Sequence, residues 1–200
     1  MPYSDFNLIK LEKQLGLKHK RGAVFERPLL KVEPSEHLIS DINDGMDLPV
    51  FSEKAKSELL ITPILREVRK KNIEKFTFFS GFALDIDSTK GLNGVCDYIF
   101  SSVPHAIEIQ APIFCLVEAK NRTIEEGYGQ CAAEMYAARQ YNLEYGKATE
   151  VMFGAVTNAF EWVFLKLEND TIVVDNERFA IKDLAELLGA LQTIVDFYTV

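Results

Sequence analysis

The segment Phe114–Lys120 ends an apolar run with two opposite charges. Glu118 and Lys120 stand two residues apart, directly after Phe114-Cys115-Leu116-Val117. In an extended strand, side chains two residues apart project from the same face, so this carboxylate and this ammonium lie together. Charges at the end of a buried strand are costly unless a partner compensates them. A divalent cation on the carboxylate, with the ammonium beside a reacting phosphate, would provide that compensation.

A second carboxylate, Asp97, is spaced so that it can reach the same place. Asp97 lies seven residues before Pro104, and Glu118 lies seven residues after Ala111. Each arm spans about 23 Å at ~3.3 Å per residue. If the chain reverses between Pro104 and Ala111, both carboxylates return to one end of an antiparallel pair. The spacing therefore predicts a common site for Asp97 and Glu118.

Hydrophobic periodicity predicts the elements that must position these residues. Helices are expected at 8–15, 52–71, 123–145 and 179–198, and strands at 75–87, 95–103, 112–120, 151–156, 162–167 and 171–174. Ser52 predicts a helix N-cap, Pro63 a kink or interruption, and Gly81 a β-bulge. This order predicts an α/β fold with a central mixed β-sheet flanked by α-helices.

The domain organisation follows from the same pattern. Residues 1–50 are expected to form an N-terminal extension or arm, and residues 51–200 the main domain. Within the first part, residues 33–52 carry five acidic residues, no Lys or Arg, and three helix breakers. This composition predicts an irregular connection with one helical turn at 36–42.

Asp97 followed by Glu118-Ala119-Lys120 resembles the motif of the PD-(D/E)xK nuclease superfamily, whose members share the restriction-endonuclease-like fold. The family order of helix, three antiparallel strands, helix and strand agrees with the elements expected from residue 52 to 156. Cys96 stands where the family usually has a proline before the Asp. The resemblance implies a metal-dependent endonuclease or exonuclease that hydrolyses phosphodiester bonds of nucleic acid, with DNA as the expected substrate.

The resemblance also implies a role for each residue of the motif. Asp97 and Glu118 would bind Mg²⁺ or Mn²⁺, joined by the backbone carbonyl of Ala119, since hard cations favour oxygen ligands. The metal would polarise the scissile phosphate and activate a water molecule. Lys120 would be the catalytic ammonium that orients the water or stabilises developing charge.

Two further site residues are expected by the same resemblance. Many members place an acidic residue of the first helix near the metal, and Glu58 is the candidate, with Glu53 as the alternative. Gln130 is similar to the helix glutamine of the RecB-like branch. That branch expects a tyrosine four positions later, where this chain has Glu134, and Tyr136 is out of register.

Other interpretations of the motif stay open. A catalytically inactive nuclease-fold module could bind nucleic acid or a protein partner. A different α/β domain that binds a small molecule or a protein could hold Lys120 and Glu118 as a structural ion pair, with Asp97 capping a turn. Asp85 and Asp87 alternate onto one face at a strand end, where they could approach a metal or be solvated.

The net charge and its distribution limit how the chain can bind nucleic acid. A net charge of −8 argues against indiscriminate coating of nucleic acid. Residues 1–32 nevertheless carry seven Lys/Arg against three Asp/Glu, and residues 53–75 carry seven against four. A local positive surface could therefore bind a phosphate backbone, although a solvated helix face accounts for the same charges.

Other sequence features argue against a membrane protein, a hydrolytic triad and a phosphate-binding loop. No apolar stretch is long enough to span a bilayer, and the start lacks a signal-peptide pattern, so no membrane association and a cytoplasmic location are expected. The three cysteines are expected to be buried hydrophobes. His19, His37 and His105 lack a nucleophile pattern, and Gly91-Leu92-Asn93-Gly94 lacks the ending of a phosphate-binding loop. A homodimer would suit the family resemblance, because many such nucleases pair to cut two strands.

Overall fold

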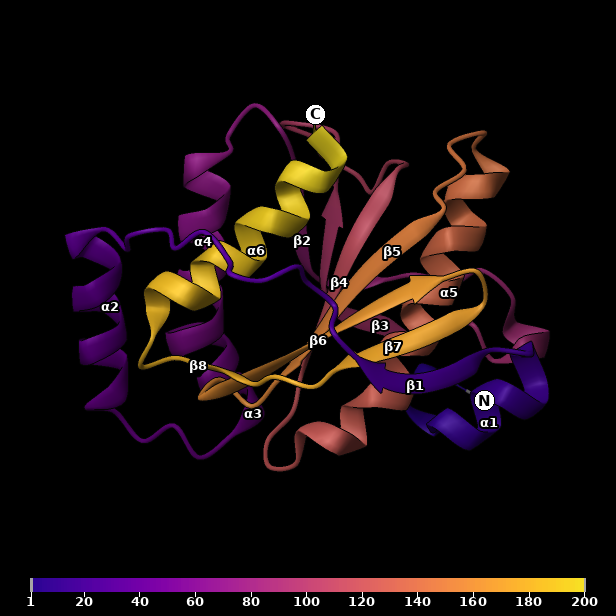
Figure 1. The fold of residues 1–200 in the computed structure, drawn as a ribbon, viewed down its shortest axis with the longest axis horizontal. Helices are drawn as coiled ribbons and strands as arrows, with labels where there is room; N and C mark the ends of the chain where they lie inside the picture. Colours follow the sequence, from indigo (N-terminus) through magenta and orange to yellow (C-terminus); the bar gives the residue numbers. More distant parts are fainter. Residues whose placement is uncertain (1, 200) are drawn as a thin grey trace.

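Eight strands form one mixed sheet in the computed structural model, which describes residues 2–199. The strands are β1 (Lys18–Gly22), β2 (Thr77–Ala83), β3 (Val95–Ser101), β4 (Ile113–Ala119), β5 (Val151–Thr157), β6 (Glu161–Glu168), β7 (Thr171–Asp175) and β8 (Phe179–Ala180). The helices are α1 (Leu8–Leu15), α2 (Glu36–Met46), α3 (Glu53–Lys56), α4 (Thr62–Lys71), α5 (Tyr128–Glu144) and α6 (Leu184–Thr199). Short helical segments are η1 (Tyr3–Asp5), η2 (Ser57–Ile61), η3 (Ser88–Lys90) and η4 (Ile124–Gly127). The expected α/β class, a mixed sheet flanked by helices, is confirmed (Figure 1).

The strand order across the sheet is β1-β7-β6-β5-β4-β3-β2, with β8 beside β6. Strands β2, β3 and β4 pair antiparallel in succession. The chain then crosses over through α5 and returns as β5, which pairs parallel to β4. Strands β5, β6 and β7 are antiparallel, and β1 closes the edge in parallel with β7. Because β5 is parallel to β4, the two strands need a crossover connection, and α5 provides it. The start of α5 therefore follows shortly after the end of β4.

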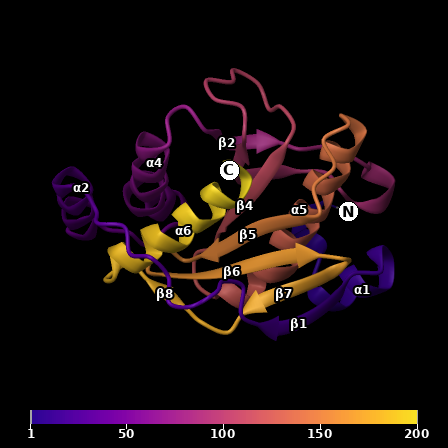
Figure 2. The same ribbon diagram turned by 45° about the horizontal axis from the view of Figure 1, so that its top comes forward.

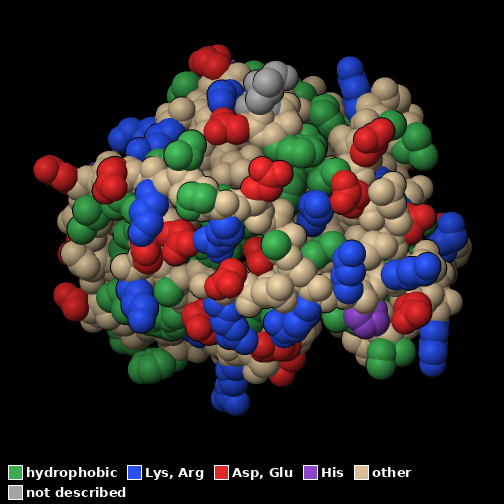
Figure 3. All heavy atoms as spheres, viewed as in Figure 1, with side chains coloured by type: hydrophobic (Ala, Val, Ile, Leu, Met, Phe, Trp, Pro, Cys, Tyr) green, Lys and Arg blue, Asp and Glu red, His purple; other side chains and the backbone are tan. Residues whose placement is uncertain are grey.

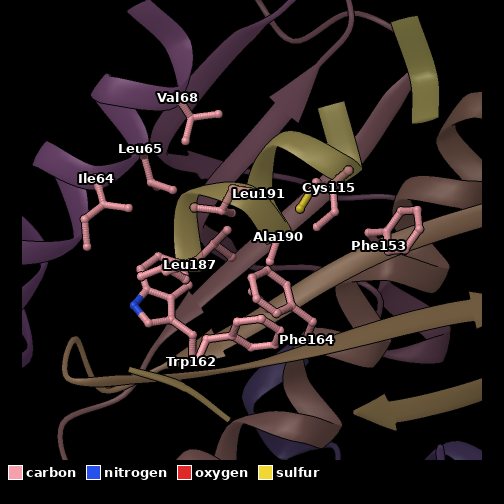
Figure 4. Packing of buried hydrophobic residues seen from close by; sticks show 14 of the residues in the cluster. Ile64, Leu65, Val68, Cys115, Phe153, Trp162, Phe164, Leu187, Ala190 and Leu191 are labelled. Atoms are coloured by element: carbon pink, nitrogen blue, oxygen red, sulfur yellow. The ribbon is translucent and has the colours of Figure 1, made fainter. Parts of the chain in front are cut away.

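Helices cover both faces of the sheet, so the molecule has three layers (Figures 1 and 2). On one face α4 and α6 pack over the central strands, and their buried side chains meet Trp162, Phe164 and Phe153 of the sheet (Figure 4). On the other face α5 packs with α1 against the opposite side of the same strands. Strand β4 is buried along its whole length, because helices cover both of its faces.

Residues before position 51 share the sheet and both hydrophobic cores. Tyr3, Phe6, Leu11 and Leu17 are buried with α5, and β1 pairs residue by residue with β7. The amino-acid pattern carries no strand signal for β1, since Lys18–Gly22 is polar and its side chains are largely exposed. Its backbone hydrogen bonds to β7 form the strand at the sheet edge.

Close packing at Gly129 holds the chain start against α5, and Gly129→Ala is expected to break this contact. A Cβ on Gly129 would overlap the backbone of Phe6 and Asn7. We expect a loss of about 2–4 kcal/mol in the free energy of unfolding, measured by urea denaturation, because backbone cannot yield as a side chain does. Gly146→Ala is the control: its φ of +67° is strained for alanine, but no atom lies within 4 Å, so about 1 kcal/mol is expected. Equal losses in the two variants would contradict the proposed clash.

The helix that begins at Ser52 runs to Lys71 with a π-helical segment, η2, in its middle. The predicted N-cap is confirmed, because Ser52 Oγ accepts a hydrogen bond from the Ala55 amide at 3.1 Å. Pro63 lacks an amide hydrogen, and the wider π-turn directly before α4 takes the place of the predicted kink.

Three local predictions were wrong. The single turn expected at 36–42 is the 11-residue α2, capped by Ser35 and held by buried Leu38 and Ile42. The last helix begins at Leu184, because Phe179–Ala180 pairs with β6 as β8. Gly81 forms no bulge: Ser80 pairs with Tyr98 and Phe82 with Cys96 in one register.

Two further expectations concern the cysteines and membrane-spanning helices. Cys96, Cys115 and Cys131 are free and buried, as expected. Within residues 2–199, no helix is both long enough and apolar enough to cross a membrane.

Candidate active site

The β3–β4 pair brings Asp97 and Glu118 to the same end of the sheet. Tyr98 pairs with Val117, so the next position outward on each strand is Asp97 and Glu118 respectively. Asp97 Oδ2 accepts a hydrogen bond from the Ala119 amide at 2.8 Å. The antiparallel pairing predicted from the two seven-residue arms is therefore confirmed.

Lys120 joins Glu118 to α5. Its Nζ lies 2.6 Å from Glu118 Oε1 and donates at 2.9 Å to Gln130 Oε1. The Lys120 amide donates to Thr157 O at 2.7 Å, which extends the β4–β5 ladder by one residue beyond β4. The structure thus places Asp97, Glu118, Lys120 and Gln130 in one connected group.

Glu134 also belongs to this connected group, although the sequence pattern predicts no role for it. It is fully buried one helical turn after Gln130, whose Nε2 donates to Glu134 Oε1 at 3.1 Å. A glutamate among small and apolar helix residues was the available signal, but only the structure shows that the carboxyl group points inward. Glu134 occupies the place where the RecB-like branch expects a tyrosine.

The carboxyl groups of Asp97, Glu118 and Glu134 act on one another, since the Asp97 charge raises the pKa of Glu118 and the Glu118 charge raises the pKa of Glu134. Among the described residues, neither Glu118 Oε2 nor Glu134 Oε2 has a donor when both groups are ionised. A proton on Glu134 supplies the missing donor to Glu118. Burial and then the Glu118 charge raise the pKa of Glu134 well above its ordinary value, so the neutral form is favoured.

Burial controls the protonation of the other two carboxyl groups as well. Burial first, and then the nearby Asp97 charge, raise the pKa of Glu118 to about 7, although the Lys120 ammonium opposes the shift. Burial also raises the pKa of Asp97, and the Ala119 amide opposes that shift. Burial alone would lower the pKa of Lys120, but the Glu118 carboxylate raises it, so the ammonium is retained. Above neutral pH, two carboxylates and one ammonium leave a net negative charge.

Glu58 and Glu53 both line a cavity of about 310 Å³ in front of Asp97. Glu58 is exposed and ion-paired with Lys54, one turn earlier on the same helical run. Its charge acts on Tyr98, whereas the charge of Glu53 acts on Asp97 and Lys120. The expected first-helix carboxylate therefore has two candidates at this cavity, and Glu53 is the one electrostatically coupled to the motif.

The donor set fits a cation held by two carboxylates. Within residues 2–199, no three His, Cys, Asp or Glu side chains converge as a metal-binding group, so a cation held here would depend on two carboxylates and on water. Mg²⁺ commonly takes one or two carboxylates and keeps several waters. Asp97, Glu118 and the Ala119 carbonyl could supply that set.

Lys56 lies next to the site, and the sequence pattern predicts no role for it either. It is only 8% exposed, its Nζ donates to Asn121 O, and it lies 5.5 Å from the centroid of the Phe160 ring. Burial lowers its pKa. This bond ties α3 to the turn that follows Lys120, so Lys56 helps to hold Glu53 beside the motif.

The other candidate groups have structural partners. Asp85 accepts a hydrogen bond from the Gly94 amide at 2.9 Å, and Asp87 caps η3 through the amides of Thr89 and Lys90. Neither carboxylate joins the Asp97 group. His37 and His105 lie on the surface beside Asp41 and Glu74.

No protein-family model matches the chain, and no curated protein matches it either. The function is therefore inferred from the geometry of the site.

Proposed function

We propose that this protein is a metal-dependent nuclease of the PD-(D/E)xK type that hydrolyses phosphodiester bonds of nucleic acid, with DNA as the expected substrate. The observation that carries the proposal is that Asp97 bonds to the Ala119 amide, next to the ion pair of Glu118 and Lys120, at the end of two paired strands. The order of α4, β2, β3, β4, α5 and β5, with β5 parallel to β4, supports a restriction-endonuclease-like core.

Each residue has a definite task in this proposal. Asp97 and Glu118 would hold Mg²⁺ or Mn²⁺, which when bound polarises the phosphate and lowers the pKa of a water molecule. The Lys120 ammonium would stabilise the charge that develops on the phosphate oxygens. Water attacks phosphorus, the bond to the leaving oxygen breaks, and that oxygen takes up a proton. Gln130 is a positioning residue, because it orients the ammonium.

Asp97→Asn is expected to abolish metal-dependent cleavage of DNA by the purified protein. Asparagine can still accept the Ala119 hydrogen bond, so the variant removes a charge from the metal site and little else. Titration calorimetry should show Mn²⁺ binding to the wild type and at least a tenfold weaker affinity in the variant.

The matched control is Asp85→Asn, which also leaves one backbone hydrogen bond in place but lies outside the group. It should bind Mn²⁺ and cut DNA as the wild type does. Wild-type protein that binds Mn²⁺ but cuts neither DNA nor RNA would favour an inactive nuclease-fold module. Failure to bind Mn²⁺ at all would overturn the proposed metal site.

A further inference from the structure

A groove of about 460 Å³ lies between α2 and α4, and its lining carries three guanidinium or ammonium groups. These groups belong to Arg66, Arg69 and Lys70. Within residues 2–199, none of them makes an ion pair with a carboxylate. Figure 3 shows Lys and Arg side chains gathered where the C-terminal end of α4 lies in Figure 1. An unpaired basic groove is unexpected on a chain with a net charge of −8.

The acidic groups at the groove do not neutralise it. Glu67 is buried and accepts hydrogen bonds from the Ser35 amide and hydroxyl, at 3.1 and 3.0 Å. It also lies 3.5 Å from Lys71, a cation that does not line the groove. Asp41 faces His37 at 3.5 Å. Glu67 is thus paired with a cation outside the groove, whereas Asp41 contacts His37, which lines the same groove. Three cations therefore face two carboxylates, one of them already paired, and the groove keeps a net positive charge.

The helix dipole accounts for only part of this charge. The C-terminal end of a helix carries about half a negative elementary charge. Lys71, at the same end, already donates to Glu33 O and pairs with Glu67. Three further cations exceed what the dipole can compensate. The remaining positive charge is available to an external anion.

The groove and the cavity in front of Asp97 share no lining residue, but they are lined by consecutive residues of α4. Thr62 lines that cavity, and the next residue, Pro63, lines the groove. Arg66 and Lys70 follow Thr62 at four and eight residues, so the three lie along one face of α4. At 1.5 Å per residue, they lie about 6 and 12 Å beyond Thr62. One nucleic acid strand rises 3.4 Å per nucleotide, so this stretch corresponds to about two to four nucleotides.

We infer that the α2–α4 groove binds the phosphates of the nucleic acid strand beyond the cleavage point and guides that strand to Asp97. The inference rests on the proposed function for the identity of the strand. Arg66 and Lys70 contact phosphates directly, and Arg69, 5.9 Å from the centroid of the Phe76 ring, adds a less mobile charge. Contacts to phosphates hold the strand without reading its sequence.

The test compares Arg66→Gln/Lys70→Gln with Lys18→Gln/Lys20→Gln. Both pairs are exposed and free of carboxylate partners within the described residues, so each variant removes two comparable charges. Binding of a fluorescent 20-nucleotide single-stranded DNA is measured by anisotropy in metal-free buffer over a range of salt concentrations. The groove variant should bind about tenfold or more weakly at 100 mM salt, and its slope of log affinity against log salt should fall by roughly 1.4.

The outcomes separate this inference from the proposed nuclease activity. Equal losses in both variants, no loss in the groove variant, or no binding by the wild type would overturn the groove assignment. Cleavage with an unchanged KM in the groove variant would also overturn it while leaving the nuclease in place. Weakened binding in a protein that never cuts would support the groove and reject the nuclease.

Discussion

Lys120→Ala is expected to lower the rate of DNA cleavage by about 10²–10³-fold, the typical cost of losing one group that stabilises transition-state charge. This corresponds to about 3–4 kcal/mol in the activation free energy. The reason is geometric, because Lys120 Nζ is held between Glu118 and Gln130 with its side chain only 20% exposed. Single-turnover cleavage at saturating Mg²⁺ measures the effect.

Lys166→Ala is the matched control for this prediction. Lys166 and Glu168 also form an ion pair two residues apart on a strand, at 3.1 Å, but on β6. The control should cut at the wild-type rate. Lys120→Gln tests the charge itself, since glutamine keeps most of the side-chain length and can donate and accept hydrogen bonds without a charge. Full activity in either Lys120 variant would reject the assigned role.

Glu134→Gln is expected to stabilise the protein at pH 8 and to have little effect near pH 4.5. Burial raises the folded-state pKa of Glu134, so between the unfolded value and this raised value the folded state binds more protons than the unfolded state. Stability is therefore lost as pH rises through that window. Glutamine removes the titrating group and keeps a donor for Glu118. We expect a gain on the order of 1–2 kcal/mol at pH 8, or a Tm higher by about 3–6 °C.

Urea denaturation followed by the fluorescence of buried Trp162, the single tryptophan, measures this difference. Glu144→Gln is the control, because Glu144 lies on the same helix but is exposed. Its stability should match the wild type at both pH values. If Glu134→Gln is less stable than the wild type at pH 8, an ionised Glu134 is needed by the fold and the proton shared with Glu118 is ruled out.

The strand pairing at the site could be predicted because it depends on local sequence. Alternation fixes the face of Glu118 and Lys120, and the equal arms indicate that Asp97 and Glu118 return to the same end of the pair. The register shift between Phe100 and Ser101 was not predicted. A site role for Gln130 was expected only from a resemblance, since no periodicity places a residue of one helix beside a strand end, and the structure adds its bond to Lys120. These are the parts of the site that short-range geometry and motif spacing can determine.

The rest of the site depends on packing that the sequence does not reveal. Glu134 looks like a polar helix residue until α5 covers β4 and buries it. Lys56 has a short-range pattern typical of an exposed helix face, yet it reaches the turn after Lys120. Strand β1 carries no hydrophobic alternation, because an edge strand needs backbone partners more than apolar side chains. Each of these unpredicted features depends on a contact between segments that lie far apart in the sequence.

The pairing of β1 with β7 also constrains how the protein is made. Lys18 meets Thr171 across the sheet edge, so a strand near the beginning of the chain waits for a partner synthesised 153 residues later. At about 5–20 residues per second, the ribosome needs roughly 8–30 seconds to supply it. Until β7 has been synthesised, Lys18–Gly22 has no strand to pair with. Its lysine-rich composition disfavours pairing with other nascent chains in that interval.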